Sequence, residues 1–248
     1  MGKKIKQLPK YEQEQQNVDS NLEEFDKGSI HIKKLDINFK TKSQEELWNL
    51  IETNQIVICS GEAGTGKSHI SLLKALDLMR GNSKKYKKIY ITTPAVEADG
   101  EKLGYLPGDV NDKLGPYMYS SIYLLKKILG DVKVNRMIER KHIEILALSY
   151  LRGVNIDNAI LICEESQNLT IKTLKTLLTR IGENAKFILN GDLSQSDRVK
   201  NHKDSGLFFA IDKLKDISDI GIFQFKENDI VRNPIITLIL KAFNENSN

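Results

Sequence analysis

Cysteine is scarce in this sequence, with only Cys59 and Cys163 among 248 residues. Two thiols cannot supply the several cross-links of a disulfide-stapled domain. Each cysteine stands at the end of an apolar run, so we expect both to be buried, reduced thiols on neighbouring strands. A disulfide between them and a metal site built on them are the disfavoured alternatives.

Long apolar runs are also missing, and none approaches the roughly 20 residues that a transmembrane helix needs. The first residues contain lysines but no apolar segment typical of a signal peptide. We therefore expect a cytoplasmic protein without a membrane partner. Neither charge dominates: 37 basic and 33 acidic residues give a net charge of +4. That balance permits a nucleic-acid partner without requiring one, and a mixed-charge solvated surface is the simpler alternative.

The sequence does contain one complete phosphate-binding motif, G-x-x-x-x-G-K-[ST], between an apolar run and a helical pattern. The run Gln55–Ser60 is long enough for one buried strand, and the apolar residues after His69 recur at helical spacing. A strand before this motif and a helix after it are the context that confirms a P-loop. The motif consists of Gly61, Glu62, Ala63, Gly64, Thr65, Gly66, Lys67 and Ser68.

The residue types of this loop explain its chemistry. Glycines allow a tight turn whose N–H groups approach phosphate oxygens, and the new helix directs its N-terminus at the same anion. Lys67 can reach the β- and γ-phosphates, and the Ser68 hydroxyl can bind Mg²⁺. A glycine turn that binds nothing is the alternative, and the complete motif with both flanks disfavours it.

A second strand, Asn158–Cys163, ends in the acids Glu164 and Glu165. Such a pair after a strand is often a solvated strand end. With a complete P-loop upstream, we instead predict a Walker B arrangement. One carboxylate then supports Mg²⁺ and the next orients the attacking water. The polar residues after the strand at Lys186–Leu189, among them Gln195, could sense the γ-phosphate.

Strands and helices alternate along the chain, which predicts an α/β fold with a parallel sheet covered by helices on both faces. Residues 1–29 are polar and are predicted to form a mobile tail, and residues 30–248 a single ATPase domain. We expect an edge strand or extended lead-in at Ile30–Phe39 and a helix capped by Ser43 with Glu46. Further elements are predicted at these ranges: strands at Lys88–Thr93, Ile143–Leu148 and Gly221–Phe225, helices at Asn111–Leu129, Val132–Arg140, Ile171–Ile181, Gly206–Leu214 and Ile236–Phe243, and a long loop at Pro94–Gly108.

With these motifs and elements in this order, the chain resembles the PhoH-like, phosphate-starvation-inducible P-loop ATPase family. A phage origin is expected. The resemblance extends from about Ser43 to Phe243 and depends on five blocks in the same order. They are Gly61–Ser68; Pro94–Ala98 with Gly104–Gly108; Arg152-Gly153; Glu165–Asn168 with Leu178–Gly182; and Gly191–Gln195 with Asp229–Arg232. The first block is shared with many P-loop proteins, whereas the second and fourth together are specific.

The resemblance implies a RecA-like core related to superfamily 1 helicases that hydrolyses ATP with Mg²⁺. It also implies RNA or single-stranded nucleic acid as partner and a homo-oligomeric ring, such as a hexamer. Gln44 would recognise adenine, although a surface-helix glutamine is the ordinary interpretation, and the nucleotide-binding set extends to His69. By the same resemblance, Glu164 would lie on the metal side, Glu165 would be catalytic, Gln195 would sense the γ-phosphate and Arg232 would be an arginine finger. Arg198 and Arg180 remain alternatives for that finger.

Three departures from the family pattern stand in the sequence: Glu164 replaces an aspartate, Thr93 replaces an arginine, and Asp99 is an extra residue. Glu164 is one methylene longer than an aspartate, so its contact with the metal would shift or run through water. The other two departures do not touch the phosphate cradle, but they put in doubt whether substrate coupling is the same. Two other functions stay open. One is a nucleotide-gated oligomeric assembly module with slow hydrolysis and no unwinding, and the other is a small-molecule phosphotransferase. The basic run Lys84–Lys88 could track a phosphate backbone or be a solvated face.

Overall fold

The computed structural model describes residues 32–94, 110–151, 153–195 and 205–231. The chain divides into two compact units after Lys34, and the unit that begins at Leu35 contains every element described below. The predicted tail at residues 1–29 lies outside the described residues. Within the described ranges, no helix is both long enough and apolar enough to span a bilayer.

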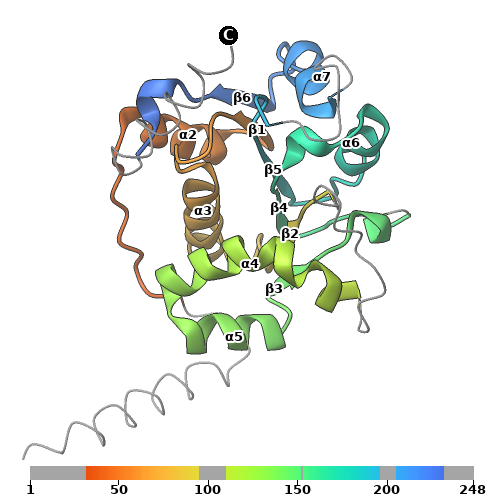
Figure 1. Cartoon of the computed structure of the whole chain (residues 1–248). Coiled ribbons are helices and arrows are strands. Elements are labelled where there is room, and N and C mark those ends of the chain that lie inside the picture. Colours follow the sequence, from red (N-terminus) through yellow and green to blue (C-terminus); the bar gives the residue numbers. More distant parts are fainter. Residues whose placement is uncertain (1–31, 95–109, 152, 196–204, 232–248) are drawn as a thin grey trace, which may run out of the picture. The chain divides into compact units, whose positions relative to one another are not determined.

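A parallel sheet forms the centre of this unit (Figure 1). Its strands follow the order β3-β2-β4-β5-β1-β6, and every neighbouring pair is parallel. The carboxyl ends of all strands therefore meet at one edge, so the segments after β1 and after β4 lie close together although about a hundred residues separate them. The strands are β1 Ile56–Ser60, β2 Lys88–Thr92, β3 Ile143–Ile145, β4 Ala159–Cys163, β5 Lys186–Gly191 and β6 Ile220–Gln224.

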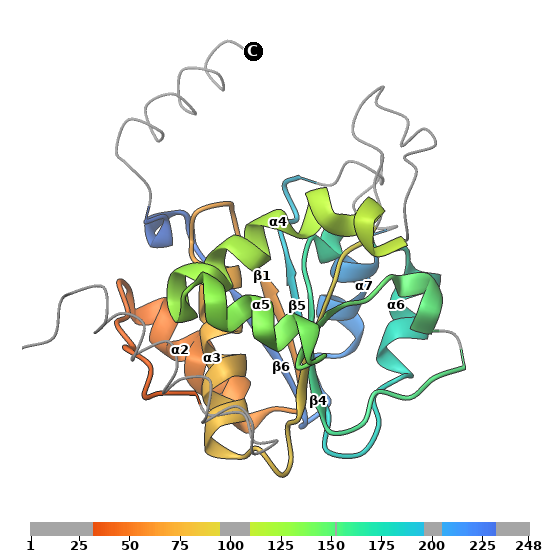
Figure 2. The ribbon, with the colours of Figure 1, turned by 90° about the horizontal axis from the view of Figure 1, so that it is seen from below.

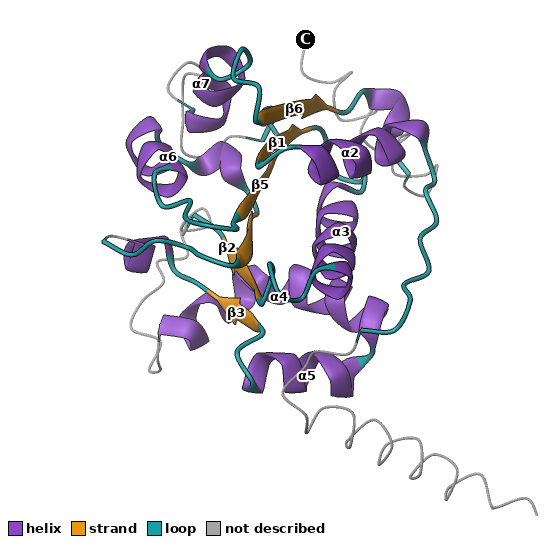
Figure 3. Ribbon diagram, turned by 180° about the vertical axis from the view of Figure 1, so that it is seen from behind, coloured by secondary structure: helices purple, strands orange, loops and turns teal. Residues whose placement is uncertain are grey.

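Helices cover both faces of the sheet, which confirms the predicted α/β class. Helices α2 (Lys42–Thr53), α3 (Lys67–Gly81) and α4 (Val110–Leu129) lie on one face, and α5 (Asp131–Glu139) packs beside α4 and β3. Helices α6 (Ile171–Leu178) and α7 (Gly206–Lys213) lie on the other face, as Figures 2 and 3 show from two further directions.

The alternation of side chains along the buried strands divides the core in two. Ile58, Leu161, Phe187 and Leu189 pack against the apolar faces of α6 and α7. Because successive strand residues point to opposite faces, their neighbours point toward α3. All five residues of β4 are buried, as expected for a central parallel strand. This double-sided burial fixes the register, since a slip by one residue would exchange the two faces.

The prediction for the cysteines is half correct. Both thiols are free and fully buried, and burial raises the pKa of each. Their strands are not neighbours, however, because β5 pairs with both β1 and β4 and separates them. Cys163 belongs to the core under α6 and α7, whereas Cys59 follows Ile58 and so points to the opposite face. The sequence could not give the strand order, on which that prediction depended.

The start of α2 also differs from the sequence-based expectation. Thr41, not Ser43, is the N-cap, and its hydroxyl accepts a hydrogen bond from the Gln44 N–H at 3.3 Å. Both residue types favour N-caps, so the sequence pattern alone did not separate them. In the helix that Thr41 caps, the Gln44 side chain donates to the P-loop carbonyl of Thr65. The described part of Ile30–Phe39 is an extended lead-in rather than a strand.

Other predicted boundaries shift modestly. The third strand stops at Ile145 and is followed by a 3₁₀ turn, Leu148–Leu151, while α6 ends at Leu178. The Thr170 cap of α6 is confirmed, since its hydroxyl accepts from the Thr173 N–H. Apart from Pro94, the predicted loop at Pro94–Gly108 and the helix at Ile236–Phe243 lie outside the described residues.

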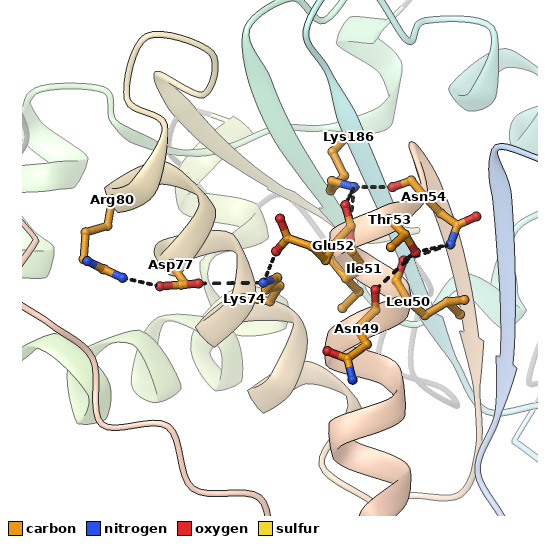
Figure 4. Close-up of polar contacts among 10 residues, drawn as sticks. All are labelled: Asn49, Leu50, Ile51, Glu52, Thr53, Asn54, Lys74, Asp77, Arg80 and Lys186. Carbon is orange, nitrogen blue, oxygen red and sulfur yellow. Dashed lines mark hydrogen bonds and ion pairs between the residues drawn. The ribbon is translucent and has the colours of Figure 1, made fainter.

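A buried lysine fastens the end of α2 to the sheet (Figure 4). The ammonium of Lys186 on β5 donates to the carbonyls of Ile51, Glu52 and Asn54 at the C-terminus of α2. These carbonyls have no partner within the helix, and the helix dipole favours a cation there. Burial acts in the opposite direction and lowers the pKa of Lys186 to about 8.

A second lysine ties α2 to α3. Lys74 is buried and pairs with Glu52 on α2 and with Asp77 on its own helix (Figure 4). Its ammonium also lies 4.1 Å from the ring centroid of Trp48, a cation–π distance. The two lysines hold α2 in place, and α2 in turn positions Gln44 at the P-loop.

We expect Lys186→Met to lower the free energy of unfolding by roughly 1–3 kcal/mol, because the helix carbonyls lose their donor. Urea denaturation measures this value. Lys172→Met is the matched control, since Lys172 is exposed on α6 and should change stability little.

The same pair of proteins tests the pKa of Lys186. Its folded-state pKa of about 8 lies below the ordinary 10.5, so the folded protein loses this proton first as pH rises. Between these two pKa values the unfolded state binds more protons than the folded state. The free energy of unfolding that Lys186 contributes therefore increases as the pH rises through this range. The difference in unfolding free energy between wild type and Lys186→Met should widen from pH 7 to pH 10; a constant or shrinking difference would contradict the assignment.

Candidate functional site

The P-loop connects β1 to α3 and bends through two left-handed glycines. Gly64 and Gly66 have φ of 98° and 93°, a region that side chains with a Cβ rarely adopt. A Cβ on Gly66 would also lie 2.7 Å from the Gln44 amide nitrogen. The hydroxyl of Thr65 donates to the Glu62 carbonyl at 2.9 Å and closes the turn internally. The loop thus has the shape that phosphate binding requires, with the N-terminus of α3 behind it.

Lys67 begins α3 and folds over the loop. Its ammonium donates to the carbonyls of Gly61 and Glu62. Burial lowers the pKa of Lys67, and the nearby carboxyl groups of Asp192, Glu164 and Glu165 oppose that change. An ammonium held inside the turn by two carbonyls is placed to meet an anion bound by the same loop.

Ser68 and Glu164 meet across the sheet edge. The Ser68 hydroxyl donates to Glu164 Oε2 at 2.7 Å, and the Asn190 amide donates to Oε1 at 3.1 Å. Asn190 is in turn fixed by the Ser71 hydroxyl at 3.0 Å. Burial raises the pKa of Glu164, while its hydrogen bonds from Ser68 and Asn190 oppose the shift.

This pair of oxygen ligands fits Mg²⁺. The ion binds hard oxygen ligands and is usually held by one or two protein groups together with substrate phosphates and waters. Among the described residues, no group of three or more His, Cys, Asp or Glu side chains could hold a metal. Ser68 and Glu164 would therefore hold Mg²⁺ jointly with phosphate oxygens. The longer Glu164 side chain, in place of an aspartate, still reaches Ser68.

Glu165 adopts an unusual backbone conformation next to this pair. Its φ of 51° lies in the left-handed region, which is costly for a residue with a side chain and often marks functional sites. The Gln167 amide donates to Glu165 Oε2 at 2.7 Å and to the Gln195 carbonyl at 3.3 Å. Gln167 Oε1 accepts from the Asp192 N–H at 3.0 Å. Gln167 therefore connects the predicted catalytic acid to the loop after β5.

Three polar residues that the sequence-based prediction did not assign emerge here: Gln167, Asn190 and Asp192. Asp192 accepts from the Ala63 N–H at 3.1 Å and so braces the P-loop directly. All three are buried. Their positions directly after strand-like runs were the available signal, but the sequence did not show which strands are neighbours.

The Gln44 side chain contacts the backbone of the P-loop. Its amide nitrogen donates to the Thr65 carbonyl at 3.0 Å, and its amide oxygen accepts from the Lys40 N–H at 2.9 Å. The side chain is buried and also lines the cleft. A contact with adenine would have to use its remaining hydrogen-bonding capacity, so its role as an adenine-recognition residue stays a prediction.

A cleft of about 680 Å³ opens above these residues. Most of the predicted site residues that the structure describes line it, including His69 and Gln195. The pKa of His69 is lowered by burial and by the positive charges of Lys40 and Lys127. Gly61, Glu62 and Thr65 contribute through the loop's internal bonds. The cleft is also lined from α4, by Ser120, Leu124, Lys127 and Ile128, which the sequence did not predict.

Of the three candidate arginine fingers, the structure describes only Arg180. Arg198 and Arg232 lie outside the described residues. The Val231 N–H donates to the Gly64 carbonyl at 3.0 Å, so the chain just before Arg232 lies on the P-loop. The Arg180 carbonyl accepts from the Ile156 N–H, which precedes β4. Arg180 therefore lies at the amino-end edge of the sheet, opposite the P-loop of its own chain.

The sequence profile of the family described as PhoH-like protein matches residues 36–244. The chain belongs to the PhoH-like family. Its curated relatives include the PhoH-like protein of Bacillus subtilis strain 168, 40% identical over 209 residues, and Protein PhoH of Escherichia coli K12, 34% identical over 206 residues. These alignments cover 84% and 82% of this PhoH-like protein but 64% and 57% of the relatives. The chain thus spans less than two thirds of their length.

Two solved structures resemble this fold at low sequence identity. The large terminase of a thermophilic bacteriophage has a TM-score of 0.47 at 11% identity, over 82% of this chain and 50% of that chain. The Pif1 helicase of Candida albicans has a TM-score of 0.39 at 16% identity, over 83% and 44%. Both TM-scores are below 0.5, so neither likeness carries an argument about this chain. The family and fold class expected from the sequence are confirmed.

We expect Glu164→Gln to weaken Mg²⁺-dependent nucleotide binding, because an amide retains the size but loses the charge that attracts the ion. Lowering the pH should produce the same loss in the wild type, since the raised pKa of Glu164 lets it protonate at a higher pH than an exposed carboxyl. Titration of a fluorescent nucleotide with and without Mg²⁺, from pH 5 to pH 8, measures both effects.

In that titration, the affinity ratio of wild type to Glu164→Gln should shrink toward acid pH. The ratio cancels protonation of the nucleotide itself. Glu183→Gln, an exposed acid at the far edge of the sheet, is the control and should bind as the wild type does. A ratio that does not change with pH would remove Glu164 from the metal site.

Proposed function

We propose that this protein is a Mg²⁺-dependent ATPase that couples ATP binding and hydrolysis to binding or remodelling of RNA or single-stranded nucleic acid. One observation carries the ATPase: the P-loop serine lies 2.7 Å from the acid that ends β4, with Glu165 held beside it by Gln167. Residues 30–248 act as one catalytic domain. A cytoplasmic location fits the proposed ATPase function.

Binding depends on the loop and the start of α3. The backbone N–H groups of Gly64–Ser68 and the helix N-terminus surround the β- and γ-phosphates, and Lys67 exchanges its loop carbonyls for phosphate oxygens. Ser68 and Glu164 would hold Mg²⁺, and the ion would supply positive charge beside these oxygens.

Hydrolysis depends on Glu165. Its carboxylate accepts a hydrogen bond from the attacking water and aligns it with the γ-phosphate. Gln167 is a positioning residue, since it holds the Glu165 carboxylate rather than the substrate. Gln195 lines the same cleft and senses the γ-phosphate. Arg232 directly follows Val231, whose N–H donates to the Gly64 carbonyl, and it neutralises the negative charge of the transition state.

The charge balance permits a nucleic-acid partner, and the half-buried Lys126 and exposed Lys127 of α4 support one. A homo-oligomeric ring is proposed from the family resemblance. If Arg180 rather than Arg232 is the arginine finger, it would serve a neighbouring subunit's site, because it lies at the edge of the sheet opposite its own P-loop. ATP turnover measured with and without single-stranded RNA and DNA tests the nucleic-acid partner. The mass in solution tests the ring. Nucleic acid that leaves turnover unchanged would favour an assembly module timed by slow hydrolysis.

We expect Glu165→Gln to retain ATP affinity but to lower the turnover rate at least about 100-fold, because general-base catalysis contributes roughly 10²–10⁴. Lys67→Ala should instead lose nucleotide binding. A phosphate-release assay and equilibrium binding separate the two results. Turnover close to wild type in Glu165→Gln would eliminate this residue as the base.

We expect Gln167→Ala to lower kcat roughly 10-fold or more while KM changes little, since a misplaced base can cost about 100-fold. A lost fold would also lower the apparent kcat, but it would lower the melting temperature as well. Gln55→Ala is the matched control, because Gln55 is an exposed glutamine at the opposite end of β1. Equal kinetics in the two variants would show that Gln167 does not position Glu165.

A further inference from the structure

Two tyrosines of α4 stack on one another in solvent. Tyr119 and Tyr123 are one helical turn apart, with ring centroids 6.2 Å apart and planes inclined by 18°. Tyr119 is 70% exposed and Tyr123 48% exposed. Single exposed aromatics are common on protein surfaces and need no explanation. Two nearly parallel, largely exposed rings present a paired aromatic surface to solvent, which we call the platform.

Positive charge adjoins this platform. The Lys127 ammonium lies 5.3 Å from the centroid of the Tyr123 ring, one turn further along α4. Lys126 lies beside it and pairs with Asp131 at 3.3 Å. A tyrosine pair that ends in a lysine combines a surface for a planar ring with an attraction for an anion.

The platform adjoins the nucleotide cleft. Buried Met118 and Leu125 fix one face of α4 against the core, while Ser120, Leu124 and Ile128 line the cleft. At 100° per residue, Tyr119 and Tyr123 lie on the neighbouring face, and Lys127 lies between the two faces. Lys127 lines the cleft and contacts Tyr123, so one side chain joins both surfaces.

We infer that Tyr119 and Tyr123 form a base-stacking platform for single-stranded nucleic acid, with Lys127 contacting the adjoining phosphate. Proteins that bind single strands combine aromatic side chains, on which bases stack, with basic residues that follow the backbone. The platform and lysine match both parts of that ligand. Every base has a π-face, so this site binds without strong sequence preference. The inference rests on the nucleic-acid part of the proposed function and names the surface that performs it.

Fluorescence anisotropy tests this site on the full chain. The probes are labelled oligo-dT and oligo-rU of about 12 nucleotides, within the usual site sizes, and an abasic strand of the same length. Tyr119→Ala/Tyr123→Ala should weaken binding of both base-containing strands at least about 10-fold and leave the abasic strand unchanged. Tyr119→Phe/Tyr123→Phe should restore affinity, because phenylalanine keeps the ring. Basal ATP turnover without nucleic acid should stay at the wild-type value.

Tyr150→Ala provides the matched control, since Tyr150 is also an exposed tyrosine but follows β3 rather than lying on α4. It should bind all three strands as the wild type does. Ultraviolet crosslinking of wild-type protein to oligo-dT should label the α4 peptide that contains Tyr119 and Tyr123. This readout does not depend on how any variant folds.

Several outcomes would overturn the inference. Unchanged oligo-dT affinity in the double alanine variant, or equal affinity of the wild type for abasic and base-containing strands, would exclude stacking at this site. A lower solution mass of the alanine variant would identify the platform as an interface between copies of the chain. If the wild type binds no strand but still hydrolyses ATP, the nucleic-acid part of the proposed function fails as well. If the wild type binds the strands and the variants bind them with the same affinity, only the platform is excluded and the proposed function stands.

Discussion

The hydrogen bond between Ser68 and Glu164 is the contact on which the site depends. It joins the start of α3 to the end of β4 across an intervening strand. It can form because all strands are parallel and their carboxyl ends meet at one edge. Apolar burial on both faces of the sheet sets the register of the paired strands. The packing of the core therefore also sets the geometry of the site. A shift of β4 by one residue would exchange Glu164 with a core residue and dismantle both.

Burying Glu164 is costly, and the surrounding polar network offsets that cost. Ser68 and Asn190 donate to its two oxygens, and Ser71 fixes Asn190. Buried carboxyl groups are tolerated when their oxygens have partners, and each link restricts the next side chain. A second network runs from Glu165 through Gln167 to Asp192 and the Ala63 N–H, and it braces the P-loop. The two acids are therefore held by separate supports, which allows them different roles.

Elements outside the motifs complete the cleft. Helix α2 contributes Gln44 and is held by Lys186 and Lys74, both buried far from the cleft chemistry. Helix α4 supplies a wall of the cleft and, one face away, the tyrosine platform. In the proposed function, this helix would connect the nucleotide site to a bound strand.

The sequence by itself determined the P-loop, the acid pair, the α/β class and the family, because each depends on local spacing and on apolar runs. It also located the Thr170 cap, whose bond spans three residues. It could not give the strand order, so it placed the cysteines on neighbouring strands. It named Ser43 as the cap of α2, because cap preference is local and does not specify which of several suitable residues begins the helix. Gln167, Asn190, Asp192 and the wall from α4 were decided by the tertiary structure alone. Their partners lie dozens of residues away, and only the packing of the sheet and helices brings those groups within hydrogen-bonding distance.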